Sequence, residues 1–176
     1  DAMDIRGLGE RTVQQLLEAG LVRDVADLFG LGVEDLLRLE GFAETSARNL
    51  VGAIAAARDR PLSRVLFGLG IRHVGFHAAQ LLARRFGTMA ALLGADPAEL
   101  AAVHGIGDTT AAAVAAYMAE PRNRSLIERL AAAGVCLEEP VEHAEHRPFA
   151  GHSFVITGTL AVSRKEMTDF IERHGG

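Results

Sequence analysis

The chain has 176 residues, of which 49% are hydrophobic and 5% aromatic, and its formal net charge is −5. This composition argues against disorder, and the negative balance argues against a broad basic surface that holds nucleic acid by charge alone. The single cysteine, Cys136, excludes a disulfide framework and a four-cysteine zinc site built by this chain alone, and no apolar run is long enough to span a bilayer.

A short turn recurs four times along the chain. It reads IRGLGERTV at 5–13, LEGFAETSA at 39–47, IRHVGFHAA at 71–79 and VHGIGDTTA at 103–111. The second small residue of the turn is Gly9, Ala43, Gly75 or Gly107, which gives a period of 32 to 34 residues. Residues 22–43 also align without gaps on residues 86–107, so a pair of turns is duplicated.

Helices are predicted between these turns. Apolar residues follow steps of three and four over 12–21 and again over 46–57. The polar residues expected to begin the helices are Thr12, Thr45 or Ser46, Asp96 with Pro97 behind it, and Thr109 or Thr110. Together with the abundance of Ala, Leu and Gly, this pattern predicts a mainly α fold in which each repeat is a helix, a tight turn and a helix.

The sequence changes character after Gly134. Residues 137–150 contain clustered glutamates, three histidines nearby and two prolines, so they are expected to form a linker. Residues 152–160, HSFVITGTL, predict a β-strand, and Ser163 with Glu166 predicts a capping box at a helix start. A strand and a helix without a partner sheet indicate the beginning of a second, incomplete α/β domain. We therefore expect the chain to be part of a longer protein.

The chemistry of the turn follows from its glycines. Glycine accepts positive φ without steric cost, and the apolar residues beside it can lock the turn between two helices. What faces outward is then bare backbone N–H at a helix N-terminus, where aligned peptide dipoles favour an anion. A single turn of this kind is often only a connector. A pair of them related by pseudo-twofold packing, however, can meet the phosphates of both strands of a duplex across a minor groove, without reading sequence.

These turns resemble helix-hairpin-helix DNA-binding modules. The run DAMDIRGLGERTVQQLLEAGLVRDVADLFGL, the segment LGIRHVG and the segment FAGHSFVITGTL are similar to the C-terminal part of bacterial NAD-dependent DNA ligases. The resemblance implies four helix-hairpin-helix motifs in two duplicated pairs over residues 1–136, a linker over 137–150, and a truncated BRCT-like domain over 151–176. In that family the four motifs follow a zinc finger and precede the BRCT domain.

The resemblance also implies which residues meet DNA. The turns would face phosphates at Gly7 and Gly9, Gly41 and Ala43, Val74 and Gly75, and Gly105 and Gly107. Side chains expected to contribute are those of Arg11, Arg48, Arg72, His77, Thr109 and Thr110. Two turns depart from the family pattern, because Ala43 replaces a glycine in the second and His73 replaces one in the third. We therefore expect the first and fourth turns to bind phosphate best.

The activity that the resemblance implies belongs to the whole enzyme. In that family a lysine takes adenylate from NAD and passes it to the 5′-phosphate of a nick, and the 3′-hydroxyl then displaces AMP. The only lysine here, Lys165, has no such motif around it, so the fragment is expected to be inactive alone and to hold nicked double-stranded DNA. The enzyme would use NAD and magnesium, carry zinc upstream, and act as a monomer in the cytoplasm at the nucleoid, without a membrane.

Two other interpretations remain open from the residues. The same DNA-binding module could belong to another repair or recombination protein, although the BRCT-like segment argues against that. A helical-repeat scaffold for protein partners has a similar period, but it does not need paired small residues at each turn. No metal ligand set is expected in the fragment. The sequence leaves open whether a monovalent cation bridges turn carbonyls and phosphate.

Overall fold

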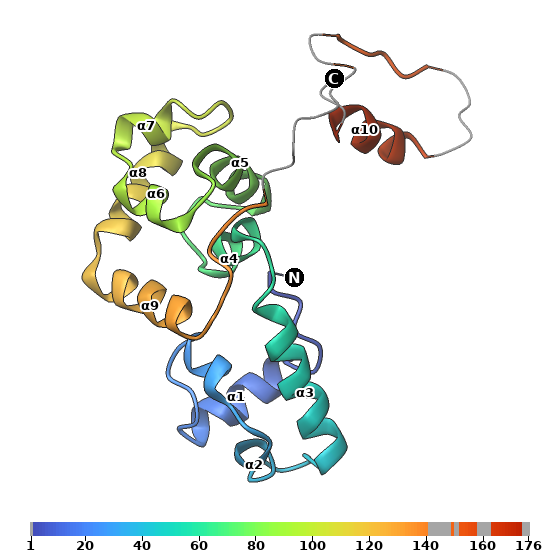
Figure 1. Ribbon diagram of the computed structural model, residues 1–176, viewed down its shortest axis with the longest axis vertical. Helices are drawn as coiled ribbons and strands as arrows, with labels where there is room; N and C mark the ends of the chain where they lie inside the picture. Colours follow the sequence, from blue (N-terminus) through green and yellow to red (C-terminus); the bar gives the residue numbers. More distant parts are fainter. Residues whose placement is uncertain (1, 141–148, 150–151, 158–162, 174–176) are drawn as a thin grey trace. The chain divides into compact units, whose positions relative to one another are not determined.

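The computed structural model describes residues 2–140, 149, 152–157 and 163–173. The chain divides into two compact units, Asp1–Pro140 and Val141–Gly176 (Figure 1). The first unit extends to Pro140, so Leu137–Pro140 belong to it and not to a linker as the sequence predicted. The rest of the predicted linker, apart from residue 149, lies outside the described residues.

The first unit is built from short helices, which confirms the mainly α prediction. Its described part contains one isolated β-bridge, between Thr88 and Glu138. In chain order its helical segments are α1 (Glu10–Glu18), η1 (Asp27–Gly30), α2 (Val33–Leu36), α3 (Glu44–Ala57), α4 (Leu62–Gly68), α5 (Phe76–Phe86), α6 (Met89–Gly94), α7 (Pro97–Ala101), α8 (Asp108–Ala119) and α9 (Pro121–Ala132). Within the described part of the chain, no helix is long and apolar enough to cross a bilayer.

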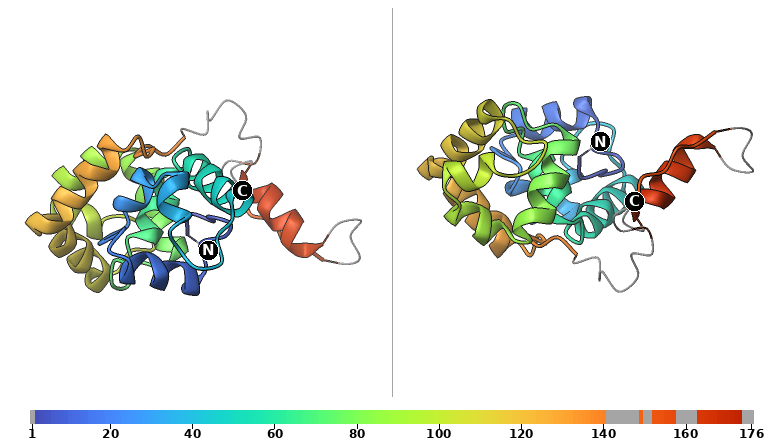
Figure 2. Two further views of the ribbon diagram at one scale, coloured as in Figure 1. Left: turned by 90° about the horizontal axis from the view of Figure 1, so that it is seen from below. Right: turned by 90° about the horizontal axis from the view of Figure 1, so that it is seen from above.

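The sequence duplication is visible in the packing of this unit. The series α1, η1, α2 and α3 is repeated by α5, α6, α7 and α8, and the two halves lie at opposite ends of the unit (Figure 1). Equivalent leucines are buried in both halves: Leu16, Leu28 and Leu36 in the first, and Leu82, Leu92 and Leu100 in the second. The end-on views show the region of α4 between the two halves (Figure 2). The buried side chains of both halves belong to one aliphatic core. Their burial stabilises the helices that supply them.

Residues 135–139 form a strap that ties α9 back to the middle of the unit. Cys136 N donates to Arg58 O at 2.7 Å, and Met89 N donates to Leu137 O at 2.9 Å. Glu139 accepts from both the amide and the hydroxyl of Ser63, at 2.8 and 2.9 Å. These hydrogen bonds satisfy the backbone of an extended segment without a sheet, which explains why local sequence rules assigned part of it to a linker.

The second unit is described only in part. Residues 152–157 have no ladder partner, so the strand predicted over 152–160 is not formed there, and 158–160 lie outside the described residues. A β-strand needs a neighbouring strand to satisfy its backbone groups. The helix α10 (Arg164–Arg173) is present, and its predicted capping box is confirmed by the bond from Ser163 N to Glu166 Oε2 at 2.8 Å and from Glu166 N to Ser163 Oγ at 3.2 Å. The hydrogen bonds from Ser163 hold the pKa of Glu166 below its ordinary value.

Candidate nucleic-acid interface

The four glycine turns share one backbone conformation. The third residue of each five-residue turn has a positive φ. The values are 87° at Gly7, 83° at Gly41, 66° at His73 and 86° at Gly105. The following amide closes each turn by donating to the carbonyl three residues earlier, at 3.2 Å for Leu8, 3.3 Å for Phe42, 3.0 Å for Val74 and 2.9 Å for Ile106. The third turn therefore keeps the geometry of the others even though His73 stands where they have glycine.

The residue that closes each turn packs toward the core. Val74 and Ile106 are 6% exposed, and Leu8 and Phe42 pack against the core in part. Val74 was expected to face phosphate, but its side chain is buried and its amide is already used inside the turn. The exposed positions of the third turn are Arg72, His73 and Gly75. The side chain of Val74, which lies between His73 and Gly75, must point inward to hold the two helices together, so it cannot face a phosphate.

Each turn runs directly into a helix whose N-cap is the second small residue. The N-caps are Gly9 for α1, Ala43 for α3, Gly75 for α5 and Gly107 for α8, all in extended conformation. The sequence placed these helix starts at Thr12, Thr45 or Ser46, and Thr109 or Thr110, which is wrong by two or three residues. Asp96, by contrast, caps α7 as predicted, accepting from Glu99 N at 2.8 Å. Side-chain preferences misled the prediction because three of the turns use glycine, which has no side chain, as the cap.

Glycine caps leave backbone donors free. The first intrahelical bonds are those from Val13, Ala47, Ala79 and Ala111 to the N-cap carbonyls. Within the described part of the chain, the three amides before each of these residues donate no hydrogen bond. The second turn differs at its cap, because the Ala43 amide donates to Ser46 Oγ at 2.9 Å. Four helices of 9 to 14 residues thus present unpaired N–H groups at their positive ends, an arrangement that suits an anion.

The fold itself does not require glycine at the capping positions. A Cβ added at Gly9, Gly75 or Gly107 would meet no heavy atom within 4 Å, and none of the three has a positive φ. The second turn already has alanine at this position. Glycine at the other three therefore keeps open the space in front of the free amides, which lets another backbone approach closely.

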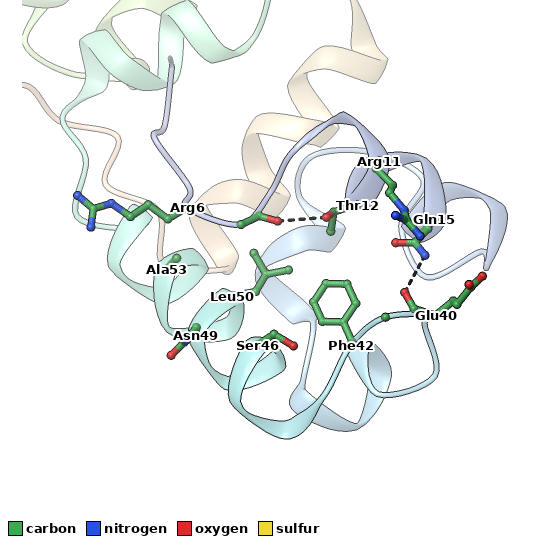
Figure 3. A pocket seen from close by; sticks show the side chains of 12 residues that line it. Arg6, Arg11, Thr12, Gln15, Glu40, Phe42, Ser46, Asn49, Leu50 and Ala53 are labelled. Carbon is green, nitrogen blue, oxygen red and sulfur yellow. Dashed lines mark hydrogen bonds between the residues drawn. The ribbon is translucent and has the colours of Figure 1, made fainter.

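A cleft lies between the first two turns. It has a volume of about 690 Å³, and its walls include Gly7 and Gly41 with α1 on one side and α3 on the other (Figure 3). Two hydrogen bonds brace it, from Thr12 Oγ1 to Gly7 O at 3.1 Å and from Gln15 Nε2 to Glu40 O at 3.0 Å. Figure 3 shows Phe42 and Leu50 at its floor, with polar side chains around the rim. The first pair of turns is thus separated by a polar-rimmed opening.

The equivalent place in the second pair is filled by an apolar side chain. Leu81 lies six residues after Gly75, as Gln15 lies six after Gly9. A Cβ added at Gly105 would lie only 2.8 Å from Leu81 Cδ1. The duplicated halves therefore share their turns but join them differently, by a hydrogen bond in the first pair and by direct packing in the second.

Charges are distributed unevenly over the four turns. Arg6 and Arg11 flank the first turn with Glu10, and Arg72, His73 and His77 surround the third without any carboxylate in 71–79. The second and fourth turns instead contain the carboxylates Glu40, Glu44 and Asp108. Each pair thus combines one cationic turn with one acidic turn.

The side chains expected to assist the turns in binding phosphate are accessible to solvent, but one of them is already paired. Arg11, Arg72, His77 and Thr109 are exposed, and Thr110 is half-buried. Arg48 is also exposed, but it forms an ion pair with Glu44 one helical turn earlier. A basic side chain that is already paired has less capacity to attract a phosphate.

Three residues that the sequence interpretation did not select also lie at the turns: Arg6, Gln15 and Phe76. Phe76 could have been found by aligning the four repeats, because Glu10, Glu44 and Asp108 occupy the equivalent first position of their helices. The bridging role of Gln15 depends on a contact with Glu40 and had no local signal. Among the described residues, no group of three His, Cys, Asp or Glu side chains could hold a metal ion.

Comparisons with known proteins agree with this arrangement. Residues 1–56 match the family described as SAM-like helix-hairpin-helix tandem, and residues 64–127 match the family described as helix-hairpin-helix motif. Over its whole length the chain is 52% identical to a DNA ligase of Gemmatimonas aurantiaca. Over 99% of its length it is 50% identical to a DNA ligase of Syntrophotalea carbinolica and 46% identical to one of Rubrobacter xylanophilus. The chain spans 26% of the length of each of these relatives.

Proposed function

Because the chain contains tandem helix-hairpin-helix motifs and is homologous along its whole length to part of DNA ligases, we propose that it binds duplex DNA through phosphates and positions a nick for sealing. The single observation that carries this proposal is the set of unpaired amides repeated at four turns of one geometry. Backbone amides bind phosphate oxygens without regard to base sequence, which is what an enzyme that acts at any nick needs.

The proposal explains how a chain of net charge −5 can hold DNA. The free amides and helix dipoles supply the attraction locally, and Arg6, Arg11 and Arg72 add charge at the first and third turns. The acidic residues of the second and fourth turns limit non-specific attraction. The sequence ranked the first and fourth turns best; from the charges we instead place the strongest phosphate contacts at the first and third turns, with the fourth turn contributing through Thr109 and its glycines.

In the whole protein this module would act by holding the substrate. We propose that it belongs to an NAD-dependent DNA ligase that joins a 3′-hydroxyl to a 5′-phosphate, with NAD supplying the adenylate, magnesium assisting and a zinc domain upstream. No lysine other than Lys165 is present in this chain, so the adenylated lysine would lie elsewhere in the protein. The chain by itself would then bind DNA as a monomer and seal nothing.

The division of the chain fits the same proposal. The unit Asp1–Pro140 would be the DNA-binding domain, and the residues from 151 onward would begin a BRCT-like domain, with the segment before them acting as the linker. The names of the relatives favour a ligase over another repair protein as the parent. Replication and repair in the bacterial cytoplasm would be its setting.

The experiment uses a substitution that improves the helix while opposing phosphate. Gly9→Asp and Gly107→Asp place a favoured capping residue where a side chain meets no neighbour, so folding should be unchanged or stabilised by a few tenths of a kcal/mol. The added carboxylate should nevertheless weaken duplex binding at least tenfold in the double variant, because it lies in front of the free amides.

Gly94→Asp is the matched control. It adds the same charge at an exposed glycine with ordinary φ and open space, at the end of α6 and away from the turns. Binding is measured by fluorescence anisotropy of a labelled nicked duplex, and folding by thermal unfolding. If Gly9→Asp and Gly107→Asp, each with one added charge, bind the duplex as well as Gly94→Asp does, the amides of these turns do not contact phosphate.

A further inference from the structure

The third turn is followed by an exposed aromatic ring. Phe76 is the first residue of α5, comes directly after Gly75, and keeps 37% of its surface exposed. The other three turns have an acidic residue at this position. An acidic residue in the first helical turn is favourable for an isolated helix, so its replacement by phenylalanine gives up a stabilising interaction and exposes apolar surface.

The ring is held in place from α4. Its centroid lies 5.7 Å from that of Phe67, at an interplanar angle of 69°, and Arg64 Cζ lies 4.8 Å from its centroid. Edge-to-face packing and a guanidinium over the ring both fix the orientation of the side chain. The exposed part of Phe76 is therefore a preorganised surface, since little conformational freedom remains to be lost on binding.

The position of the ring determines what it would touch. The amides of Phe76, His77 and Ala78 donate no hydrogen bond within the described part of the chain, and the ring belongs to the same helical turn. A ligand with a phosphate at those amides and its next group on the exposed part of the ring would contact both. In a nucleic acid the group bonded to each phosphate is a sugar, whose carbon face is apolar.

Resting on the proposed function, we propose that Phe76 packs against a deoxyribose of the bound duplex and gives the third turn an apolar contact that the other turns lack. Removal of the 2′-hydroxyl makes the sugar of DNA the better partner for a phenyl ring, because a ribose would bury a hydroxyl against it. The third turn would then bind by both phosphate and sugar, and Arg72 would supply the charge beside it.

The test separates the apolar contact from the phosphate contacts by their salt dependence. Each phosphate contact releases counterions and contributes to the slope of log K against log salt, whereas an apolar contact changes affinity at every salt concentration and leaves the slope alone. The 176-residue protein and the variants Phe76→Ala, Phe76→Leu and Arg72→Ala are titrated with a labelled nicked DNA duplex at several salt concentrations. Leu17→Ala is the matched control, because it removes a side chain that is 52% exposed at the far end of α1.

Phe76→Ala should weaken binding about tenfold and leave the slope of log K against log salt unchanged. This is the loss expected when the exposed third of a phenyl ring is no longer there to be buried on binding. Phe76→Leu should recover part of that affinity, Leu17→Ala should bind as the unchanged protein does, and Arg72→Ala should lower the slope by about one. The unchanged protein should bind an RNA–DNA hybrid duplex more weakly than the DNA duplex. Phe76→Ala should reduce this difference in affinity.

Two results would overturn the inference while leaving the proposed function intact. One is unchanged binding by Phe76→Ala with a normal unfolding transition. The other is a loss of affinity accompanied by a lower slope, which would mean that the ring only positions a phosphate contact. If the unchanged protein itself does not bind the duplex, the proposed function fails first and this inference fails with it.

Discussion

Arg129 Nη1 lies 2.5 Å from Asp24 Oδ2, a residue 105 positions earlier in the chain, and Arg129 Nη2 lies 2.5 Å from Asp27 Oδ1. This guanidinium on α9 is thus paired with Asp24 in the loop before η1 and with Asp27, the first residue of η1. Arg23 also contacts Asp27, with its amide at 2.9 Å and its Nε at 3.2 Å. A charged network therefore connects α9 to the η1 region, in addition to the shared core.

The network predicts a pH dependence of stability. Hydrogen bonds from Arg23, with smaller contributions from the charges of Arg23 and Arg129, hold the pKa of Asp27 below its ordinary value. Because the folded pKa lies below the unfolded value of about 3.9, the network stabilises the fold above that pH, and its contribution is lost as the pH falls through the folded value. Asp27→Asn should lower the thermal midpoint by a few degrees at pH 7.

The difference between Asp27→Asn and the unchanged protein should stay constant from pH 7 to about pH 5, and it should shrink once the pH falls below about 4 toward the folded pKa of Asp27. Asp59→Asn, at an exposed position after α3, is the control and should show no such trend. Thermal unfolding followed by circular dichroism from pH 7 to about pH 2, which spans the unfolded and folded pKa values of Asp27, measures both. A midpoint difference that stays constant across this range would show that Asp27 is not stabilised as its contacts indicate.

The two glycines of a turn should respond differently to alanine. Gly105→Ala forces a Cβ into a residue with φ of 86° and brings it within 2.8 Å of Leu81 Cδ1, so it should destabilise the fold by about 1–2 kcal/mol. Gly107→Ala meets neither constraint and should change stability by less than about 0.5 kcal/mol. Gly41→Ala has the positive φ without the close contact and should fall between them. Urea unfolding ranks the three variants, and an equal loss at 105 and 107 would contradict the assignment.

His73 allows the opposite substitution, from a residue with a side chain to glycine, at the same position of a turn. It holds φ of 66° with a side chain, where the other turns use glycine. His73→Gly should therefore stabilise the fold, or at least leave it unchanged, with a gain of up to about 1 kcal/mol offset in part by the entropy of glycine in the unfolded chain. A clear loss of stability in urea unfolding would show instead that the His73 side chain makes a contact that stabilises the turn.

The strap depends on one carboxylate. Ser63 is 4% exposed, and its amide and hydroxyl both donate to Glu139. Glu139→Ala leaves these donors without that partner and should destabilise the fold by about 1–3 kcal/mol. Glu138→Ala removes the exposed neighbouring side chain while keeping the backbone bond to Leu62, so it should be nearly neutral. Equal stability of the two variants in chemical unfolding would mean that the strap is held by its backbone bonds alone.

Much of the interface was readable from the chain because its signals are local. The positive φ of a turn and the start of the helix after it depend on only a few neighbouring residues. The repeated pattern of small residues was therefore enough to locate all four turns and the duplicated pairs. The helix starts were placed too late because a hydroxyl-bearing side chain is the usual cap, and these turns omit it. The residues 137–140 were misassigned because their hydrogen bonds go to partners far away in the chain, such as Ser63 and Gly87.

The sequence by itself determined where the chain turns and that helices lie between the turns, since both follow from periodicity and backbone preference. Only the tertiary structure decided that His73 adopts the conformation of a glycine, that Gln15 bridges one pair of turns by a hydrogen bond where Leu81 packs in the other, and that Arg129 pairs with Asp24 and Asp27. The reason is physical: such contacts depend on distances between residues far apart in the chain, and packing of the whole unit sets those distances.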